Sequence, residues 1–116
     1  MIRIKRIYEP PDKADGHRIL VDRLWPRGMK KENAAIDRWM KEIAPSDGLR
    51  KEFGHEPERW DAFRKRYFAE LDEQQAVVSE LMAIAKRTTV TLLFSAANTE
   101  INNAVALKEY LEKRAS

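Results

Sequence analysis

The pattern of hydrophobic and polar positions predicts three β-strands in the chain. Isoleucines alternate with basic residues over positions 2–8, which is typical of a strand, and Pro10-Pro11 follow as a stop. The short apolar run 19–21 predicts a buried second strand. Residues 89–94 are β-branched or apolar at every position, which predicts an interior third strand covered on both faces.

Helical spacing of apolar residues begins after the second predicted strand. Residues 35–43 have this spacing, with Asn33 as a candidate N-cap and Pro45 as a stop, so they predict the first helix. Ser46 predicts the start of a short helical segment, and Gly54 predicts its end.

The strongest helical pattern begins at Pro57 and runs to residue 85 without a breaking residue. One long helix and two helices that meet near residues 72–75 fit this pattern equally well. Asn98 or Thr99 is the expected N-cap of a last helix. The expected inner face of that helix carries Ala104, Leu107, Tyr110 and Leu111.

Strands separated by helices predict an α/β fold. We expect a small, mainly parallel sheet of about three to four strands with helices packed on it, in one domain over residues 1–116. If the second and third strands run parallel, their carboxyl ends lie at the same edge. Open α/β sheets bind ligands at that edge, which directs attention to the two loops that follow these strands.

Composition excludes several classes of protein. The chain has 116 residues, 35% of them charged, and no cysteine, which excludes disulfides, thiolate nucleophiles and cysteine-ligated zinc. No apolar run approaches the roughly 18 residues that span a bilayer, so we expect no membrane association. Charges interrupt the N-terminal segment where a secretory signal needs an apolar core, which predicts a cytoplasmic location.

The positive charge is concentrated at the N-terminal end. Residues 1–31 contain nine basic and four acidic residues, whereas the formal net charge of the whole chain is only +3. This basic third makes nucleic-acid binding an alternative function, although no recognition helix with a basic face is evident.

The loop after the second predicted strand has the most unusual composition. It places Asp22, Arg23, Trp25 and Arg27 within six residues. Guanidinium groups bind phosphate or carboxylate through two points, and the indole offers a flat surface for a ring. A purely structural role is the alternative: Trp25 would pack on Pro26, and Asp22 would pair with an arginine to hold the turn.

The loop after the third predicted strand leads into the last helix. Ser95 and Asn98 lie in this small polar loop, and free backbone donors at a helix N-terminus favour an anion. Asn103 is expected on the inward face of the helix, where its amide needs partners. These residues are either ligand contacts or ordinary caps and clamps, and the sequence does not separate the two roles.

Few side chains are suited to catalysis. Asp22 is the best acid–base candidate, although its arginine neighbours favour the carboxylate form. Ser95 lacks the glycines of a nucleophile elbow. His17 and His55 have no second histidine nearby, so we expect neither a metal nor another cofactor.

Several blocks of the chain resemble one bacterial family. The resemblance covers nearly the whole chain and is carried by the blocks at residues 21–28, 44–53, 60–71, 92–96 and 102–104. Asp-Arg-Leu-Trp-Pro-Arg-Gly at 22–28 is its most specific part. The chain resembles the YeaO-like proteins, grouped as domain of unknown function 488, which implies a small cytoplasmic α/β protein without an established activity. Many relatives carry Tyr in place of Phe94 and Lys in place of Ala97, so this chain lacks that hydroxyl and that ammonium.

We therefore expect a pocket for a small anion or a phosphorylated metabolite at the C-terminal edge of the sheet. Its expected residues are Asp22, Arg23, Trp25, Arg27, Ser95, Asn98 and Asn103. If the pocket is an active site, Asp22 would orient or deprotonate a substrate group. The alternatives are a nucleic-acid-binding regulatory protein and a non-catalytic interaction subunit. The sequence assigns no oligomeric state.

Overall fold

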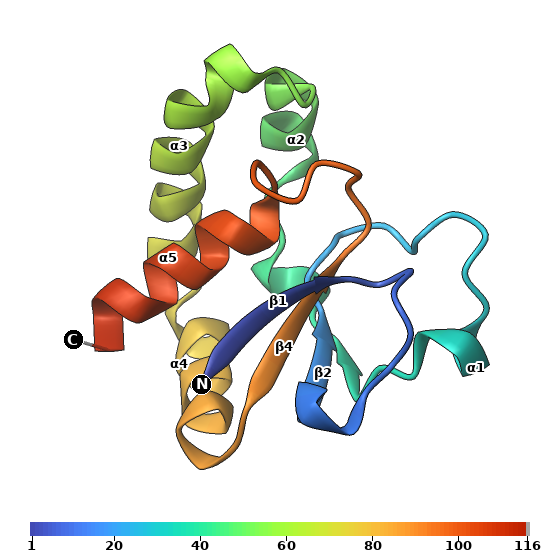
Figure 1. Ribbon diagram of the computed structural model, residues 1–116. Coiled ribbons are helices and arrows are strands. Elements are labelled where there is room, and N and C mark those ends of the chain that lie inside the picture. Colours follow the sequence, from blue (N-terminus) through green and yellow to red (C-terminus); the bar gives the residue numbers. More distant parts are fainter. Residues whose placement is uncertain (116) are drawn as a thin grey trace.

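The computed structural model describes residues 1–115 and contains a parallel four-stranded sheet (Figure 1). Its strands are β1 (Ile2–Arg6), β2 (His17–Leu20), β3 (Arg38–Trp39) and β4 (Val90–Phe94). The strand order is β1-β4-β2-β3, and every pairing is parallel. The predicted small α/β fold with a mainly parallel sheet is confirmed.

Five α-helices accompany the sheet within residues 1–115. They are α1 (Lys31–Ala34), α2 (Asp47–Phe53), α3 (Trp60–Asp72), α4 (Gln75–Arg87) and α5 (Asn103–Ala115). Short 3₁₀ turns occupy Lys13–Asp15, Lys41–Ile43 and Pro57–Arg59. The three long helices α3, α4 and α5 lie on one side of the sheet (Figure 1).

The two faces of the sheet are covered differently. Alternate residues of β4 point to opposite faces, and all five are buried. Val90, Leu92 and Phe94 belong to the main core beneath the long helices. Leu93 belongs to a smaller cluster with Ile7, Leu20 and Ala34 on the other face. The predicted interior strand is confirmed, with loops and α1 as the cover on the second face.

The predicted helix over residues 35–43 is wrong. Ala35 adopts a left-handed conformation (φ 49°) and ends α1. The chain then forms β3, because Asp37 N–H donates to Arg18 O at 2.8 Å and Met40 N–H donates to Leu20 O at 2.9 Å. The apolar side chains of this segment therefore line an edge of the sheet instead of one face of a helix.

The long helical pattern forms two helices, α3 and α4, which meet at residues 73–74.

The last helix begins later than predicted. Asn98 accepts hydrogen bonds from the N–H groups of Glu100 and Ile101, which closes a turn before α5. Asn102 is the N-cap, since its Oδ1 accepts from Val105 N–H at 2.9 Å.

Ser46 joins α2 to α3. Its Oγ accepts from Leu49 N–H at 3.2 Å, so the predicted N-cap is confirmed. Its own N–H and Oγ donate to the Glu70 carboxylate at 2.8 and 2.6 Å. The end of α2 is also as predicted, with Gly54 in the left-handed conformation. Together these contacts fix α2 beside the C-terminal edge of the sheet.

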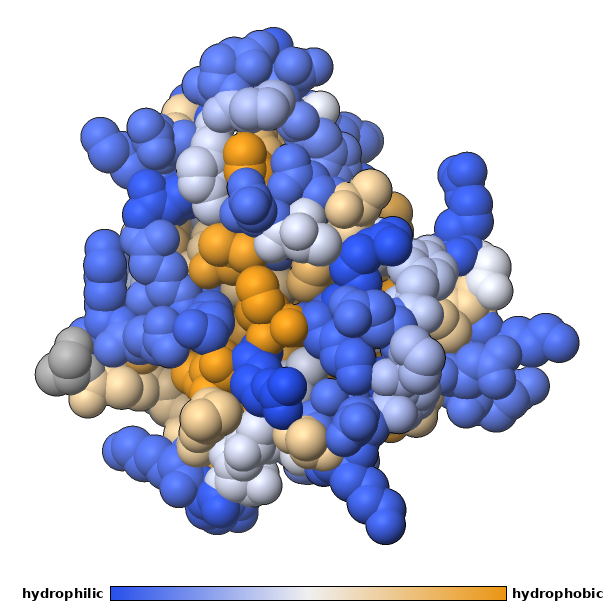
Figure 2. Space-filling model, viewed as in Figure 1, coloured by the Kyte–Doolittle hydropathy of each residue, from blue (hydrophilic) through white to orange (hydrophobic). Residues whose placement is uncertain are grey.

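Hydrophobic side chains gather over α5 and β1 on the face shown in Figure 2, with hydrophilic side chains around them. A groove of about 600 Å³ lies here, and Ile4 and Val105 form its apolar part. Lysine and glutamate side chains of α5 border it.

No helix within residues 1–115 is long and apolar enough to cross a membrane.

Candidate functional site

A cavity of about 290 Å³ lies where β2 and β4 end. Three parts of the chain form its walls: the loop 22–27 after β2, the residues 95–103 that lead into α5, and α2 with the residues that follow it. The strands are parallel and in register, so their carboxyl ends bring the first two segments together. Pro45 and Phe63 complete the lining.

Asp22 ties the two loops to each other. Its Oδ2 accepts hydrogen bonds from the N–H and the Oγ of Ser95, at 2.9 and 2.8 Å. Its Oδ1 accepts from the Asn103 Nδ2 at 3.1 Å, and the same amide nitrogen donates to Val21 O at 2.9 Å. Asp22 is therefore bound to neutral donors and not to the arginines beside it in the sequence.

Arg23 braces the loop against the segment before α2. Its Nε donates to Pro45 O at 3.0 Å, and its Nη2 donates to Ala44 O at 3.2 Å. Tyr67 lies nearby and is fully buried, with its hydroxyl donating to Ile43 O at 2.7 Å. Burial raises the pKa of Tyr67 well above its ordinary value, and the Asp22 carboxylate raises it further, so the hydroxyl remains a donor.

Two other arginines leave donors available at the cavity. Arg27 is exposed, and no hydrogen bond or ion pair within the described chain holds its guanidinium. Arg50 of α2 also lines the cavity, and its Nη2 donates to Asp47 Oδ1 at 3.1 Å. His55 lies at the same wall with a positive φ of 59°, a strained conformation for a residue with a side chain.

Apolar side chains form the rest of the wall. Phe53 and Phe63 stack with their ring centroids 4.6 Å apart. Trp25 packs edge-on against Trp39, at 5.3 Å between centroids, and its indole N–H donates to Met29 O at 2.7 Å. Leu24 also lines the cavity, although its side chain is 57% exposed. The cavity therefore combines cationic groups with a substantial apolar surface.

Another arginine holds the loop after β4 from outside. Arg6, the last residue of β1, donates from Nε to Ala96 O at 2.8 Å and from Nη2 to Ser95 O at 3.1 Å. Asn102 Nδ2 donates to Asn98 O at 2.9 Å. These contacts fix the loop before any ligand arrives.

The structure brings most of the predicted site residues to one cavity. Asp22, Arg23, Trp25, Arg27, Ser95 and Asn103 all line it. Asn98 is outside the lining, because its side chain closes the turn before α5. The third wall, which was not predicted, adds Arg50, Phe53 and His55. The helical spacing of Arg50 and Phe53, three residues apart, was the available signal, since it places both on one side of α2.

No group of three or more histidine, aspartate or glutamate side chains within residues 1–115 is arranged to hold a metal ion. The chemistry of the cavity depends on guanidinium, amide and hydroxyl donors. These groups bind oxyanions, and the only carboxylate in the lining is Asp22.

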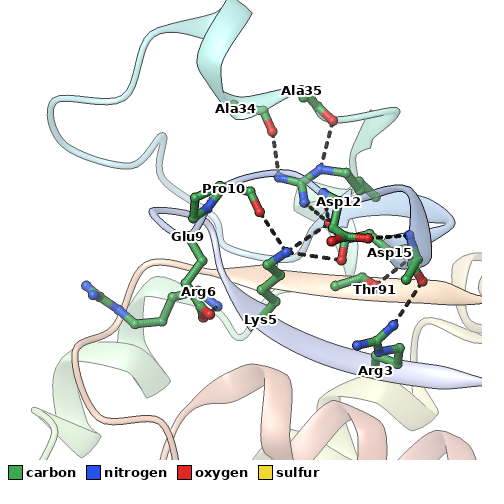
Figure 3. Close-up of polar contacts among 12 residues, drawn as sticks. Arg3, Lys5, Arg6, Glu9, Pro10, Asp12, Asp15, Ala34, Ala35 and Thr91 are labelled. Atoms are coloured by element: carbon green, nitrogen blue, oxygen red, sulfur yellow. Dashed lines mark hydrogen bonds and ion pairs between the residues drawn. The ribbon is translucent and has the colours of Figure 1, made fainter.

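A second polar cluster lies before β2 on the other face of the sheet (Figure 3). Asp15 is 2% exposed and accepts hydrogen bonds from Lys5 Nζ, at 3.1 Å, and from the Arg18 guanidinium. Arg18 also donates to the carbonyl oxygens of Ala34 and Ala35, at 2.8 and 3.0 Å. This cluster is filled by its own contacts and attaches α1 to the sheet.

Replacing Asp22 with alanine is expected to lower the free energy of unfolding by about 1–3 kcal/mol, because the Ser95 and Asn103 donors lose their acceptor. Urea denaturation measures this change. Glu58→Ala is the matched control, since Glu58 is exposed and its replacement is expected to change stability by less than about 0.5 kcal/mol. Equal stabilities for the two variants would contradict the role given to Asp22.

A parallel sheet with long helices on one side defines a small α/β protein, with a cavity beyond the ends of β2 and β4. The chain belongs to the YeaO-like DUF488 family, since the family profile described as "Inactive DUF488-N3 subclade" matches residues 1–116.

Two relatives illustrate the similarity. "Uncharacterized protein YeaO" of Escherichia coli (strain K12) is 49% identical over 110 residues, which cover 95% of this chain and 96% of the relative. "Uncharacterized protein Rv3073c" of Mycobacterium tuberculosis (strain ATCC 25618 / H37Rv) is 38% identical over 113 residues, which cover 97% and 95%. No solved structure gives a significant match.

Proposed function

We propose that the protein binds a small anion, such as a phosphorylated metabolite, in the cavity at the C-terminal edge of the sheet. The observation that carries this proposal is the charge of the lining. Arg23, Arg27 and Arg50 line the cavity together with one carboxylate, Asp22. Both oxygens of Asp22 accept hydrogen bonds from neutral groups, and no ion pair joins this carboxylate to Arg23, Arg27 or Arg50 within residues 1–115.

Binding without catalysis is the form of this function that the site supports best. Asp22, the best acid–base candidate, accepts three hydrogen bonds that join two loops, which is a structural use of the carboxylate. Ser95 Oγ donates to Asp22 and has no histidine as a base partner. The word "Inactive" in the description of the matched subclade also favours a protein without catalytic activity.

The N-terminal cations favour a small anion over a nucleic acid. Five of the nine basic residues in positions 1–31 donate to backbone carbonyls or to Asp15 through their side chains. They are Arg3, Lys5, Arg6, Arg18 and Arg23. Since the donors of these groups already serve the fold, they are less available to contact the phosphates of a polyanion.

Thermal unfolding in phosphate and in chloride at equal ionic strength tests the proposal. We expect phosphate to raise the melting temperature of the wild-type protein, because a ligand that binds only the folded state stabilises it. Arg27→Ala is expected to weaken phosphate binding by about tenfold, the effect of losing one charge-assisted contact.

Arg87→Ala is the matched control, because Arg87 is an exposed cation at the end of α4 and does not line the cavity. Phosphate should raise the melting temperature of this variant as much as it raises that of the wild type. Equal phosphate effects in Arg27→Ala and the wild type, or no effect in either protein, would refute the proposed site.

A further inference from the structure

Arg50 contains a buried donor that the protein itself leaves unused. Its Nε is the only buried side-chain nitrogen or oxygen within residues 1–115 that has no hydrogen-bond partner. The side chain as a whole is 40% exposed, and its one ion pair, to Asp47, uses Nη2. A buried N–H of a charged group without an acceptor is costly, and Arg50 lines the cavity. An oxyanion in the cavity would bind the exposed part of this side chain, beside the unpartnered Nε.

Another part of the lining is apolar and partly open to solvent. Leu24, at the cavity, is 57% exposed and is one of three exposed large hydrophobic residues among those that the structure describes. The aromatic residues Trp25, Phe53 and Phe63 continue this surface inward. An inorganic anion would contact only the arginines and leave this surface in water. A ligand with an apolar part would cover it, and burial of that area adds to affinity.

We propose, as an extension of the proposed function, that the ligand is an amphipathic anion: a flat apolar body, such as one aromatic ring, that carries a phosphate or a carboxylate. The guanidinium groups of Arg50 and Arg27 bind the oxyanion, and Leu24, Trp25 and Phe53 contact the flat body. The volume of about 290 Å³ is at the lower limit of ligand pockets, which suits a single ring and is too small for a dinucleotide.

Three probes separate the two halves of this ligand. Phenyl phosphate carries both halves, inorganic phosphate carries only the anion, and phenol carries only the ring. Titrations followed by ¹H–¹⁵N NMR report on the cavity directly, because the indole N–H of Trp25 gives its own signal. Phenyl phosphate is expected to bind at least about tenfold more tightly than inorganic phosphate, from burial of the ring. Phenol is expected to bind more weakly than phenyl phosphate by a similar factor.

Leu24→Ser tests the apolar half. The side chain is already 57% exposed, so this variant is expected to fold normally. It should reduce the preference for phenyl phosphate over inorganic phosphate while it leaves the affinity for inorganic phosphate unchanged. An unchanged preference would overturn the assignment of the flat body to this wall.

Arg50→Met tests the anionic half. It is expected to weaken binding of both phosphates by about tenfold or more, and to leave the melting temperature of the ligand-free protein unchanged or higher, because the unpartnered donor is removed. Lys51→Gln, which removes an exposed cation from the same helix outside the cavity lining, should change neither quantity. Undiminished binding by Arg50→Met would overturn the role of Arg50.

The two proposals fail in different ways. Equal affinities of the wild type for phenyl phosphate and inorganic phosphate would refute the amphipathic ligand and leave the anion site standing. If neither phosphate shifts the Trp25 signal, the anion site itself is refuted.

Discussion

Replacement of Asp15 by alanine is expected to lower the free energy of unfolding by about 3–5 kcal/mol. Asp15 is 2% exposed and Arg18 is 5% exposed, so the variant leaves the guanidinium buried without its charged partner. The Lys5 ammonium and the Asp12 N–H lose the same acceptor. Figure 3 shows Lys5 and Asp12 beside Asp15. The cost is that of an uncompensated buried charge, which greatly exceeds the value of an exposed ion pair.

Urea denaturation of Asp15→Ala and Asp61→Ala measures the difference. Asp61 also forms an ion pair with an arginine, Arg64, but its side chain is 90% exposed, so its replacement is expected to cost less than about 1 kcal/mol. A small effect at both positions would contradict the buried-charge argument. The double variant Asp15→Ala with Arg18→Met should recover part of the lost stability, because it removes both buried charges.

The contacts of Asp15 with Lys5 and Arg18 should also make the stability of the protein depend on pH in the acid range. Burial alone would raise the pKa of Asp15, but the Asp12 N–H and the Lys5 and Arg18 cations together hold this pKa below its ordinary value of 3.8. A lowered pKa in the folded state means that the carboxylate contributes stability above the unfolded pKa. This contribution is lost as the pH falls below about 3.8. The loss of stability below that pH should be smaller in Asp15→Ala than in the wild type.

Local patterns were sufficient to predict most of the sheet and of the long helices. β1 and β4 follow their alternating and continuous apolar patterns, because both strands pack against the main core. The inner face predicted for α5 is buried, including Leu107 and Tyr110. In these segments the apolar residues that create the pattern are the same residues that the core requires.

The segment 35–43 shows where such patterns fail. Its apolar residues have helical spacing, but their partners are distant in sequence, in β2. Backbone hydrogen bonds to Arg18 and Leu20, together with the left-handed Ala35, override the weak helical preference. A pairing between β2 and a two-residue strand leaves no recognisable pattern in the sequence of either segment.

The candidate site was predictable to the extent that it depends on parallel strands. The carboxyl ends of β2 and β4 meet, so the loops that contain Asp22 and Ser95 had to lie together. The orientation of α2 is different, because it depends on contacts such as those between Ser46 and Glu70 that link distant segments. Helical spacing places Arg50 on the same side of α2 as Phe53, but only tertiary packing decides that this side faces the cavity.

The role of each arginine also depends on tertiary structure. Arg23 and Arg27 are equivalent in a sequence-based argument, since both follow the same strand. In the structure the Arg23 side chain donates to the carbonyls of Ala44 and Pro45, whereas the Arg27 guanidinium has no hydrogen bond or ion pair within residues 1–115. A guanidinium that already has acceptors adds little to ligand binding, so Arg27 and Arg50 carry most of the expected affinity.

Gly16→Ala is expected to destabilise the protein by about 3–5 kcal/mol or to prevent folding. Gly16 has a φ of +64°, and a Cβ at this position would lie 2.2 Å from the carbonyl oxygen of Thr89. This close approach places His17 N–H at 2.8 Å from the same oxygen and begins the pairing of β2 with β4. The oxygen belongs to the backbone at the start of a buried strand, so relief of the clash requires displacement of the sheet.

Variants at two other glycines distinguish the cost of a Cβ clash from the cost of a positive φ. Gly28 has a φ of +76° with nothing within 4 Å of a Cβ, so Gly28→Ala should cost only the strain, about 1–2 kcal/mol. Gly48 lies in α2 with open space around it, and Gly48→Ala should stabilise the protein by about 0.5–1 kcal/mol. Urea denaturation should rank the three variants in this order, and a Gly16→Ala protein as stable as Gly28→Ala would contradict the contact with Thr89. Because β2 also carries Asp22 into the cavity, a Gly16→Ala protein that still folds should bind phosphate more weakly than Gly28→Ala.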